Sequence, residues 1–206
     1  MKEREDADRQ MGELTIGTSE KICDNFGRIN TTMVLNRELK YNGYLKVELL
    51  NVQSPSGKTF PREVLRKQNA VAALVYNTAT GKYIFARQWR PGPEGDILEI
   101  PAGVRDKPGE SREDCVAREV LEEVGYHVDR TQFIAEGYVS PGATTEMIAV
   151  YYAEVSQKVE PGGGLATEDE EIEIVELTYD EMLAITFNDF KSIIALQWVK
   201  YNRGNQ

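Results

Sequence analysis

The sequence contains little cysteine and almost no histidine. Its 206 residues include two cysteines, Cys23 and Cys115, and one histidine, His127. Two distant cysteines do not suggest a disulfide framework, so we expect both to be packing residues in a reduced, cytoplasmic compartment. A single histidine excludes a zinc site with several histidine ligands, and a Ser-His-Asp triad would have to use His127.

Long apolar segments and excess positive charge are also missing. No stretch approaches the roughly 20 apolar residues that span a bilayer, and the charged segment Met1 to Asp6 lacks the apolar region of a signal peptide. The net charge of −10 would repel nucleic acid and anionic membranes, so we expect neither as a partner. A phosphate substrate stays open because a divalent cation can join carboxylates to phosphates.

The length favours one domain, or one domain with a substantial appendage. We expect a flexible tail at 1–12, a β-rich region at 13–66 and the main domain at 67–206. Hydrophobic patterns bounded by turn residues predict strands at 31–39, 44–51, 59–64, 70–76, 82–89, 97–100, 132–139, 147–155 and 172–177. The first three strands are too small to be stable alone and need a partner surface.

Three helices are predicted. The first begins after Ser111, a suitable N-terminal cap, and ends at Gly125. A second covers 179–185, and a third begins near Asp189. The third helix carries four large apolar residues on one face: Phe190, Ile194, Trp198 and Tyr201. Strands separated by single helices indicate an α+β or sandwich architecture.

The first helix carries a cluster of acids. Glu119 and Glu123 are four residues apart, so they project from one face, and Glu122 adds a third carboxylate. Like charges at this spacing cost a few tenths of a kcal/mol, and a hard dication would remove that cost. Arg118 can hold Glu122 by a bidentate contact. Taken alone, the acids could also be an ordinary solvated helix face.

The context of the acids favours a metal site. The segment from Gly103 to Tyr126 resembles the Nudix box, which reads Gly, five residues, Glu, seven residues, Arg-Glu-apolar-any-Glu-Glu-any-Gly-apolar. The spacing from Glu110 onward fits, and the later positions match at Arg118, Glu119, Val120, Glu122, Glu123, Gly125 and Tyr126. Six residues rather than five separate Gly103 from Glu110. The resemblance implies an α+β protein: a Nudix-type α/β/α sandwich with a mixed sheet, preceded by a small N-terminal antiparallel β-sheet.

Further segments resemble the Nudix branch that hydrolyses ADP-ribose and GDP-mannose. They are Arg-Glu at 62–63, Arg-Gln-Trp-Arg at 87–90, Ser-Pro-Gly at 140–142 and the glycine-plus-acid loop at 162–173. Each segment alone has an ordinary reading as a turn or a solvated surface. Their joint order and spacing favour the branch.

The resemblance implies a Mg²⁺ cofactor, with Mn²⁺ as a possible substitute. Its ligands would be Glu119, Glu123, Glu170 and the backbone carbonyl of Ala102. Glu122 would ligate as well or bridge through water, and it belongs with Arg118 to the catalytic set. Mg²⁺ keeps several waters and binds substrate phosphates, so an incomplete protein shell is expected.

The resemblance also implies the general base and the substrate contacts. Glu168 is the expected base and Glu146 its rival. Arg62 and Arg90 would hold phosphate oxygens, and Tyr44 could stack on the base or sugar. The full set of expected substrate-binding residues is Arg62, Glu63, Arg90, Gly103, Val104, Glu146 and Tyr44.

These residues predict a pyrophosphatase that cuts a nucleoside diphosphate sugar into a nucleoside monophosphate and a sugar phosphate. ADP-ribose, GDP-mannose and UDP-glucose remain open as substrates. In the family the small N-terminal sheets usually pair, so a homodimer is expected. The alternatives are a Nudix hydrolase for another nucleotide class, such as diadenosine polyphosphates, oxidised nucleoside triphosphates or coenzyme A, and a non-catalytic nucleotide-sugar sensor.

Overall fold

The computed structural model describes residues 31–165 and 170–203. The tail predicted at 1–12, Cys23 and the expected base Glu168 lie outside these residues. Within them, no helix is both long and apolar enough to cross a membrane. The chain divides into two compact units, one made of residues 1–38 and 49–62 and the other of residues 39–48 and 63–206.

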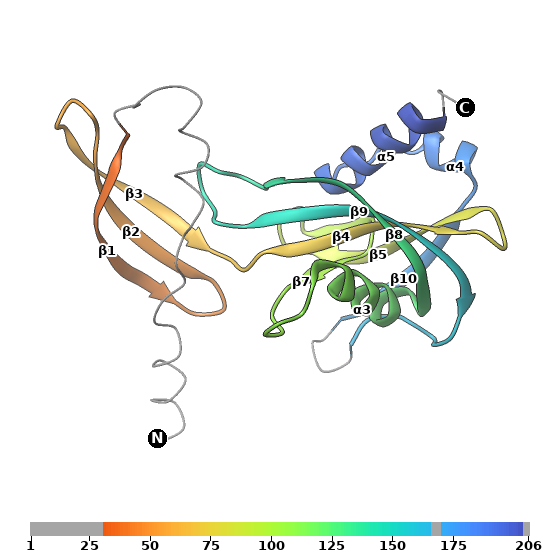
Figure 1. Cartoon of the computed structure of the whole chain (residues 1–206). Coiled ribbons are helices and arrows are strands. Elements are labelled where there is room, and N and C mark those ends of the chain that lie inside the picture. Colours follow the sequence, from red (N-terminus) through yellow and green to blue (C-terminus); the bar gives the residue numbers. More distant parts are fainter. Residues whose placement is uncertain (1–30, 166–169, 204–206) are drawn as a thin grey trace, which may run out of the picture. The chain divides into compact units, whose positions relative to one another are not determined.

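A mixed sheet forms the centre of the larger unit (Figure 1). In the described residues its order is β10-β5-β4-β9-β8, with β6 paired to β5 and β7 paired to β4. The strands are β4 (Ala70–Asn77), β5 (Lys82–Arg90), β6 (Gly95–Glu99), β7 (Ala102–Val104), β8 (Tyr126–Tyr138), β9 (Met147–Lys158) and β10 (Glu173–Leu177). Only the pairing of β4 with β9 is parallel.

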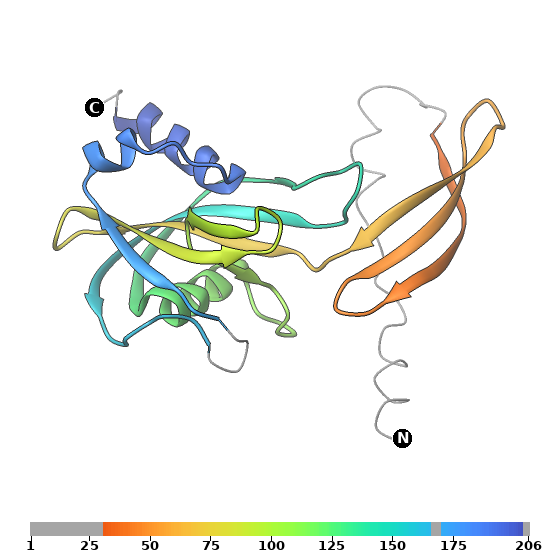
Figure 2. The ribbon, with the colours of Figure 1, turned by 180° about the vertical axis from the view of Figure 1, so that it is seen from behind.

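The central strand β4 explains the layered architecture. Its sequence, AVAALVYN, is apolar almost throughout. A strand that is apolar on both faces must be covered on both faces. Figures 1 and 2 show α3 (Arg112–Val124) against one face and α4 (Tyr179–Ala184) and α5 (Phe190–Arg203) against the other. Two apolar clusters fill the layers, one containing Val116 and Val120 and the other Leu196 and Val199. The predicted α/β/α sandwich is confirmed.

The helix that carries the acids begins and ends where the sequence predicts. The Ser111 side chain accepts a hydrogen bond from the backbone N–H of Asp114, 3.0 Å away. Gly125 takes the left-handed conformation (φ 82°) that ends the helix. Cys115, Val116, Val120 and Val124 are buried. Cys115 is a free thiol in the core, so its predicted packing role is confirmed.

The C-terminal helix differs from its predicted pattern. Of the four residues on the predicted face, Trp198 packs against the core, with its ring centre 5.3 Å from that of Tyr152, but Phe190, Ile194 and Tyr201 are exposed. Helix α5 instead packs through small and aliphatic residues on another face, namely Ser192, Ala195, Leu196 and Val199. The spacing of the large apolar residues therefore indicated the wrong face of α5. Ala195 allows the helix to approach the sheet closely, whereas large side chains would hold it away.

Strand lengths also differ from the predictions at two places. Strand β8 begins at Tyr126, directly after α3, six residues before the predicted start, and it pairs with β9 through three register shifts. Strand β7 was not predicted, because Ala102–Val104 is too short to give a periodic signal. It pairs with Ala70–Ala72 of β4 and so fixes the loop that enters the acidic segment.

The first three strands form a sheet of their own. They are β1 (Met33–Asn42), β2 (Lys46–Gln53) and β3 (Thr59–Arg66), in the order β1-β2-β3. The predicted small N-terminal antiparallel sheet is confirmed. All ten residues of β1 are exposed, among them Met33, Val34, Leu35 and Leu39.

Candidate active site

Two carboxylates of α3, one buried and one partly buried, lie beside β7. Glu123 is 2% exposed, and the Glu119 side chain is 12% exposed. The Glu123 Oε2 atom accepts a hydrogen bond from the backbone N–H of Ala102 at 3.3 Å. Glu119, Glu123 and Ala102, all predicted as metal ligands, therefore lie close together in the structure.

Gly103 makes room for Glu119. A Cβ atom at position 103 would lie only 1.8–2.1 Å from three atoms of the Glu119 carboxyl group. A side chain at position 103 would therefore force the Glu119 carboxyl group out of its place. The first glycine of the Nudix-like segment is thus required by the position of the first helix carboxylate.

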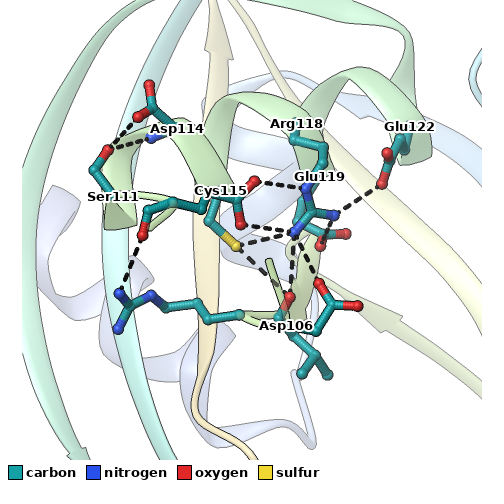
Figure 3. Close-up of polar contacts among 10 residues, drawn as sticks. Asp106, Ser111, Asp114, Cys115, Arg118, Glu119 and Glu122 are labelled. Carbon is teal, nitrogen blue, oxygen red and sulfur yellow. Dashed lines mark hydrogen bonds and ion pairs between the residues drawn. The ribbon is translucent and has the colours of Figure 1, made fainter. Parts of the chain in front are cut away.

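Arg118 organises the other acids (Figure 3). Its guanidinium donates two hydrogen bonds to Glu110, at 2.8 and 3.1 Å, one to Glu119 at 2.5 Å and one to Glu122 at 3.1 Å. A further bond reaches the carbonyl oxygen of Val104 at 3.2 Å. The predicted bidentate contact with Glu122 is wrong: the planar fork pairs with Glu110, and Glu122 receives a single bond. Arg118 thus binds both ends of the segment 104–110, which contains the extra residue.

Burial sets the electrostatics of the two inner acids. It raises the pKa of Glu119 to about 7, with help from Glu122 and Glu170 and against the pull of Arg118. Burial also raises the pKa of Glu123 well above its usual range, and the charges of Glu119, Glu170 and Glu99 add to this. The Arg118 guanidinium lowers the pKa of Glu110. Glu119 and Glu123 therefore have too little positive charge around them to balance their own charges.

A glycine run fastens the later acidic loop to the end of α3. Gly162, Gly163 and Gly164 all have positive φ, between 70° and 106°. The N–H groups of Gly163 and Gly164 donate to the carbonyl oxygens of Glu123 and Glu122, at 2.8 and 3.2 Å. Any residue with a side chain would be strained at these angles. The run brings Glu170 close enough to raise the pKa of both Glu119 and Glu123.

The acidic residues suit a hard divalent cation. In the part of the chain that is described, no three acidic, histidine or cysteine side chains already form a metal-binding cluster. Glu123 is buried, yet among those same residues it forms no ion pair and accepts only the bond from Ala102. A buried carboxylate without a cation is costly. Carboxylate oxygens are ligands that Mg²⁺ accepts, so Glu119, Glu123 and Glu170 fit a metal of this type.

A second charged group lies next to the first. Glu99 is 4% exposed; one of its oxygens pairs with Arg90 Nε at 2.7 Å, and the other contacts Lys191 Nζ. Lys191 also pairs with Asp189 at 3.0 Å. Arg90 was predicted as a substrate residue, whereas Glu99 and Lys191 were not. The sequence does contain a signal for Glu99, which lies between the apolar residues Leu98 and Ile100. An acid in such a run needs a charged partner.

The remaining predicted residues have contacts and exposure of their own. Glu146 forms an ion pair with Lys67 at 3.0 Å. Tyr44 follows β1 and is fully exposed. Arg62 and Glu63 are exposed on β3, and the Arg62 guanidinium lies 4.4 Å from the centre of the Phe60 ring. The structure brings Glu119, Glu123, Glu170, Ala102 and Gly103 together, with Arg118 and Val104 beside them.

Comparison with known proteins identifies the fold and motif. Residues 66–198 match the family model described as the NUDIX domain. The chain belongs to the Nudix family. It is a Nudix hydrolase, as the box predicts, and the acids of α3 are those of its Nudix helix.

Curated relatives support the same branch of the Nudix family. A GDP-mannose pyrophosphatase of Yersinia enterocolitica is 36% identical over 68% of this chain and 77% of that protein. A methanol dehydrogenase activator of Bacillus methanolicus is 33% identical over 84% of this chain and 95% of its own length. The predicted ADP-ribose and GDP-mannose branch is confirmed.

A solved structure supports the Nudix fold. A crystal structure of an ADP compounds hydrolase superposes with a TM-score of 0.72, at 23% identity, over 85% of this chain and 96% of that one. This likeness covers the sandwich and extends beyond the residues of the family model.

We predict that Gly103→Ala abolishes metal binding while the protein stays folded. The added methyl group would displace the Glu119 carboxylate, and a 1 Å displacement can cost about 100-fold in rate. Isothermal titration with Mn²⁺ measures the binding, and circular dichroism monitors the fold. Gly92→Ala is the matched control, because a Cβ there meets nothing within 4 Å. Unchanged Mn²⁺ affinity in Gly103→Ala would contradict the prediction.

We predict a pH-dependent role for Glu110 in stability. Its folded-state pKa is lowered below the usual 4.5, so its contribution is complete above pH 4.5 and is lost as the pH falls toward the folded value. Glu110→Gln should unfold about 2 kcal/mol more easily at pH 7, and this difference should shrink below pH 4.5. Urea titrations at both pH values measure it, with exposed Glu160→Gln as control. A difference that persists at pH 3.5 would refute the assignment.

Proposed function

We propose that this Nudix hydrolase cleaves the pyrophosphate of a nucleoside diphosphate sugar in a Mg²⁺-dependent reaction. The observation that carries the proposal is the carboxylate pair on α3, in which Glu123 is buried and Glu119 is partly buried. The charge of Arg90 acts on Glu123, so a cation site and a guanidinium are available to one substrate. Relatives named as GDP-mannose pyrophosphatases support the substrate class. ADP-ribose, GDP-mannose and UDP-glucose are the candidate substrates.

Each residue has a definite task in this proposal. Glu119, Glu123, Glu170 and the Ala102 carbonyl would hold Mg²⁺, with Glu122 as a further or water-bridged ligand. A bound dication would stabilise negative charge on the pyrophosphate and increase the acidity of water. Arg118 holds Glu110 and Glu119 in position through its bonds to both. Arg90 can bind phosphate oxygens, since only its Nε is committed to Glu99 among the described contacts.

The reaction consumes one water. The water oxygen forms a bond to one phosphorus, the bridging P–O bond breaks, and the leaving phosphate keeps the electron pair. A general base takes the water proton. We propose Glu168 for this role, because the carboxylate of its rival Glu146 is already paired with Lys67 at 3.0 Å.

The assay uses ADP-ribose, GDP-mannose and UDP-glucose with Mg²⁺. We expect one nucleoside monophosphate and one sugar phosphate per substrate molecule consumed, measured by ³¹P NMR and liquid chromatography. Glu119→Gln and Glu123→Gln should lose Mn²⁺ binding together with activity. Release of inorganic phosphate, or no reaction with any of the three substrates, would exclude the proposal.

Two further variants separate the candidate bases. Glu168→Gln should lose about 10²–10⁴-fold in kcat with Mn²⁺ affinity unchanged, and Glu146→Gln should keep most of its activity. The opposite result would transfer the role to Glu146. Full activity in both variants would remove both residues as the base.

We also propose that residues 13–66 form a dimerisation region ahead of the catalytic domain at 67–206. The support is β1, an edge strand of ten exposed residues that includes Met33, Val34, Leu35 and Leu39. An exposed apolar edge strand is usually paired or covered. We assign Arg62, Glu63 and Tyr44 to substrate contacts within such a dimer.

Sedimentation velocity tests the oligomeric state. The protein should sediment as a dimer, and Val34→Lys with Leu35→Lys should shift it to a monomer because buried charges oppose the contact. Lys58→Glu on the exposed turn before β3 serves as the control. A wild-type protein that sediments as a monomer at micromolar concentration would disprove the dimer.

A further inference from the structure

A cavity of about 620 Å³ lies between α5 and strands β6, β8 and β9. Its walls are mainly apolar and come from all four elements, with Ile97, Ile148 and Ile194 among them. Small-molecule sites typically occupy roughly 300–1,000 Å³ and combine apolar walls with a few fixed polar groups. This cavity therefore has the size and composition of a binding site.

The charged residues of the cavity lining are Arg90, Glu99, Asp189, Lys191 and Glu136, and Asn188 adds an amide. Glu136 is already paired with Arg112 at 2.6 Å. Lys191 Nζ contacts Glu99 and Asp189, and an ammonium group has three N–H donors, so one donor is left for a ligand. Within the described residues the terminal nitrogens of Arg90 form no hydrogen bond. The lining thus carries two positive and three negative side chains, and Arg112 outside the lining balances Glu136. Such a group favours a neutral, hydroxyl-rich ligand over an anion.

The residues that line the cavity also favour a sugar over a nucleobase as the ligand. A base stacks on aromatic faces. The aromatic residues of the lining, Tyr138 and Phe190, are 54% and 77% exposed, so they lie at the rim and the inner wall is aliphatic. A sugar ring has aliphatic faces and hydroxyl groups that both donate and accept hydrogen bonds. Its faces suit the isoleucine walls, and its hydroxyls suit the ammonium and carboxylate groups.

The cavity adjoins the acids of the Nudix helix. Arg90 and Glu99 line it, and Ala102, three residues after Glu99, donates its backbone N–H to Glu123 at 3.3 Å. A pyrophosphate bound between Arg90 and the acids would therefore have one of its two substituents at the cavity.

We propose that this cavity binds the sugar half of the nucleoside diphosphate sugar, with Lys191 as a specificity-determining hydrogen-bond donor. The inference rests on the proposed function. It adds a location for the sugar and assigns a role to the first turn of α5, a segment outside the Nudix box.

Saturation-transfer NMR with methylene-bridged analogues of ADP-ribose and GDP-mannose tests this, because such analogues bind with Mg²⁺ but cannot be hydrolysed. In the wild type, sugar protons should receive saturation. Ile194→Trp fills the cavity, so the sugar-proton signals should fall while base-proton signals persist. The matched control is Gln197→Trp, which places the same side chain at an exposed position of α5 outside the cavity lining. Unchanged sugar signals in Ile194→Trp, or loss confined to base protons, would overturn the inference.

Steady-state kinetics provide a second readout that does not depend on the tryptophan variant folding. Lys191→Met should raise KM about 10-fold or more and alter the preference among ADP-ribose, GDP-mannose and UDP-glucose, and Lys191→Arg should restore part of the affinity. An equal loss of kcat on all three substrates with KM unchanged would instead mark Lys191 as structural and refute the assignment.

The two proposals can fail separately. If the wild type hydrolyses none of the three nucleotide sugars but its sugar protons still receive saturation, the proposed function fails and the cavity assignment stands. If hydrolysis occurs and the sugar protons receive no saturation, the cavity assignment alone is refuted.

Discussion

The guanidinium of Arg118 holds the acids of this site in position. Arg118 holds Glu110, Glu119 and Glu122 together, although carboxylates at such helix spacings repel one another. The same group fastens the loop to the helix, because Glu110 and the Val104 carbonyl both bind it. A planar fork with five donors can meet these demands, and a lysine could not. The remaining acid, Glu123, is left buried without this support, and that imbalance is what a divalent cation would correct.

The sandwich supplies the rest of the site through short connections. Strand β7 binds the Ala102–Val104 segment to the centre of the sheet, and the glycine run at 162–164 binds the later loop to the end of α3. The N-terminal turn of α5 holds the Glu99–Ile100 segment, through Lys191 and through the Ser192 hydroxyl that accepts a bond from Ile100 N–H at 2.9 Å. Each layer thus contributes one contact that fixes a functional loop.

Local patterns predicted the parts of the structure that depend on neighbours in sequence. The caps of α3, the apolar strand β4 and the alignment of Glu119 with Glu123 all follow from spacing within one element. Contacts between distant residues were not predictable in this way. Lys191 pairs with Glu99, which lies 92 positions earlier in the sequence, and Glu146 pairs with Lys67, which lies 79 positions earlier. No local pattern encodes such partners. The buried face of α5 was also missed, because close packing on the sheet favours Ala195 over the larger side chains nearby.

Lys191 follows the sheet and the Nudix helix in the sequence, and this order sets the steps of synthesis. Translation delivers the Nudix helix, the glycine run and all strands of the sheet before α5 appears. Until then Glu99 lacks its lysine partner and Ile100 lacks the Ser192 hydroxyl. A nascent chain therefore carries the complete acidic motif while one wall of its cavity is still missing. This part of the site is therefore complete only after α5 has been made and has packed against the sheet.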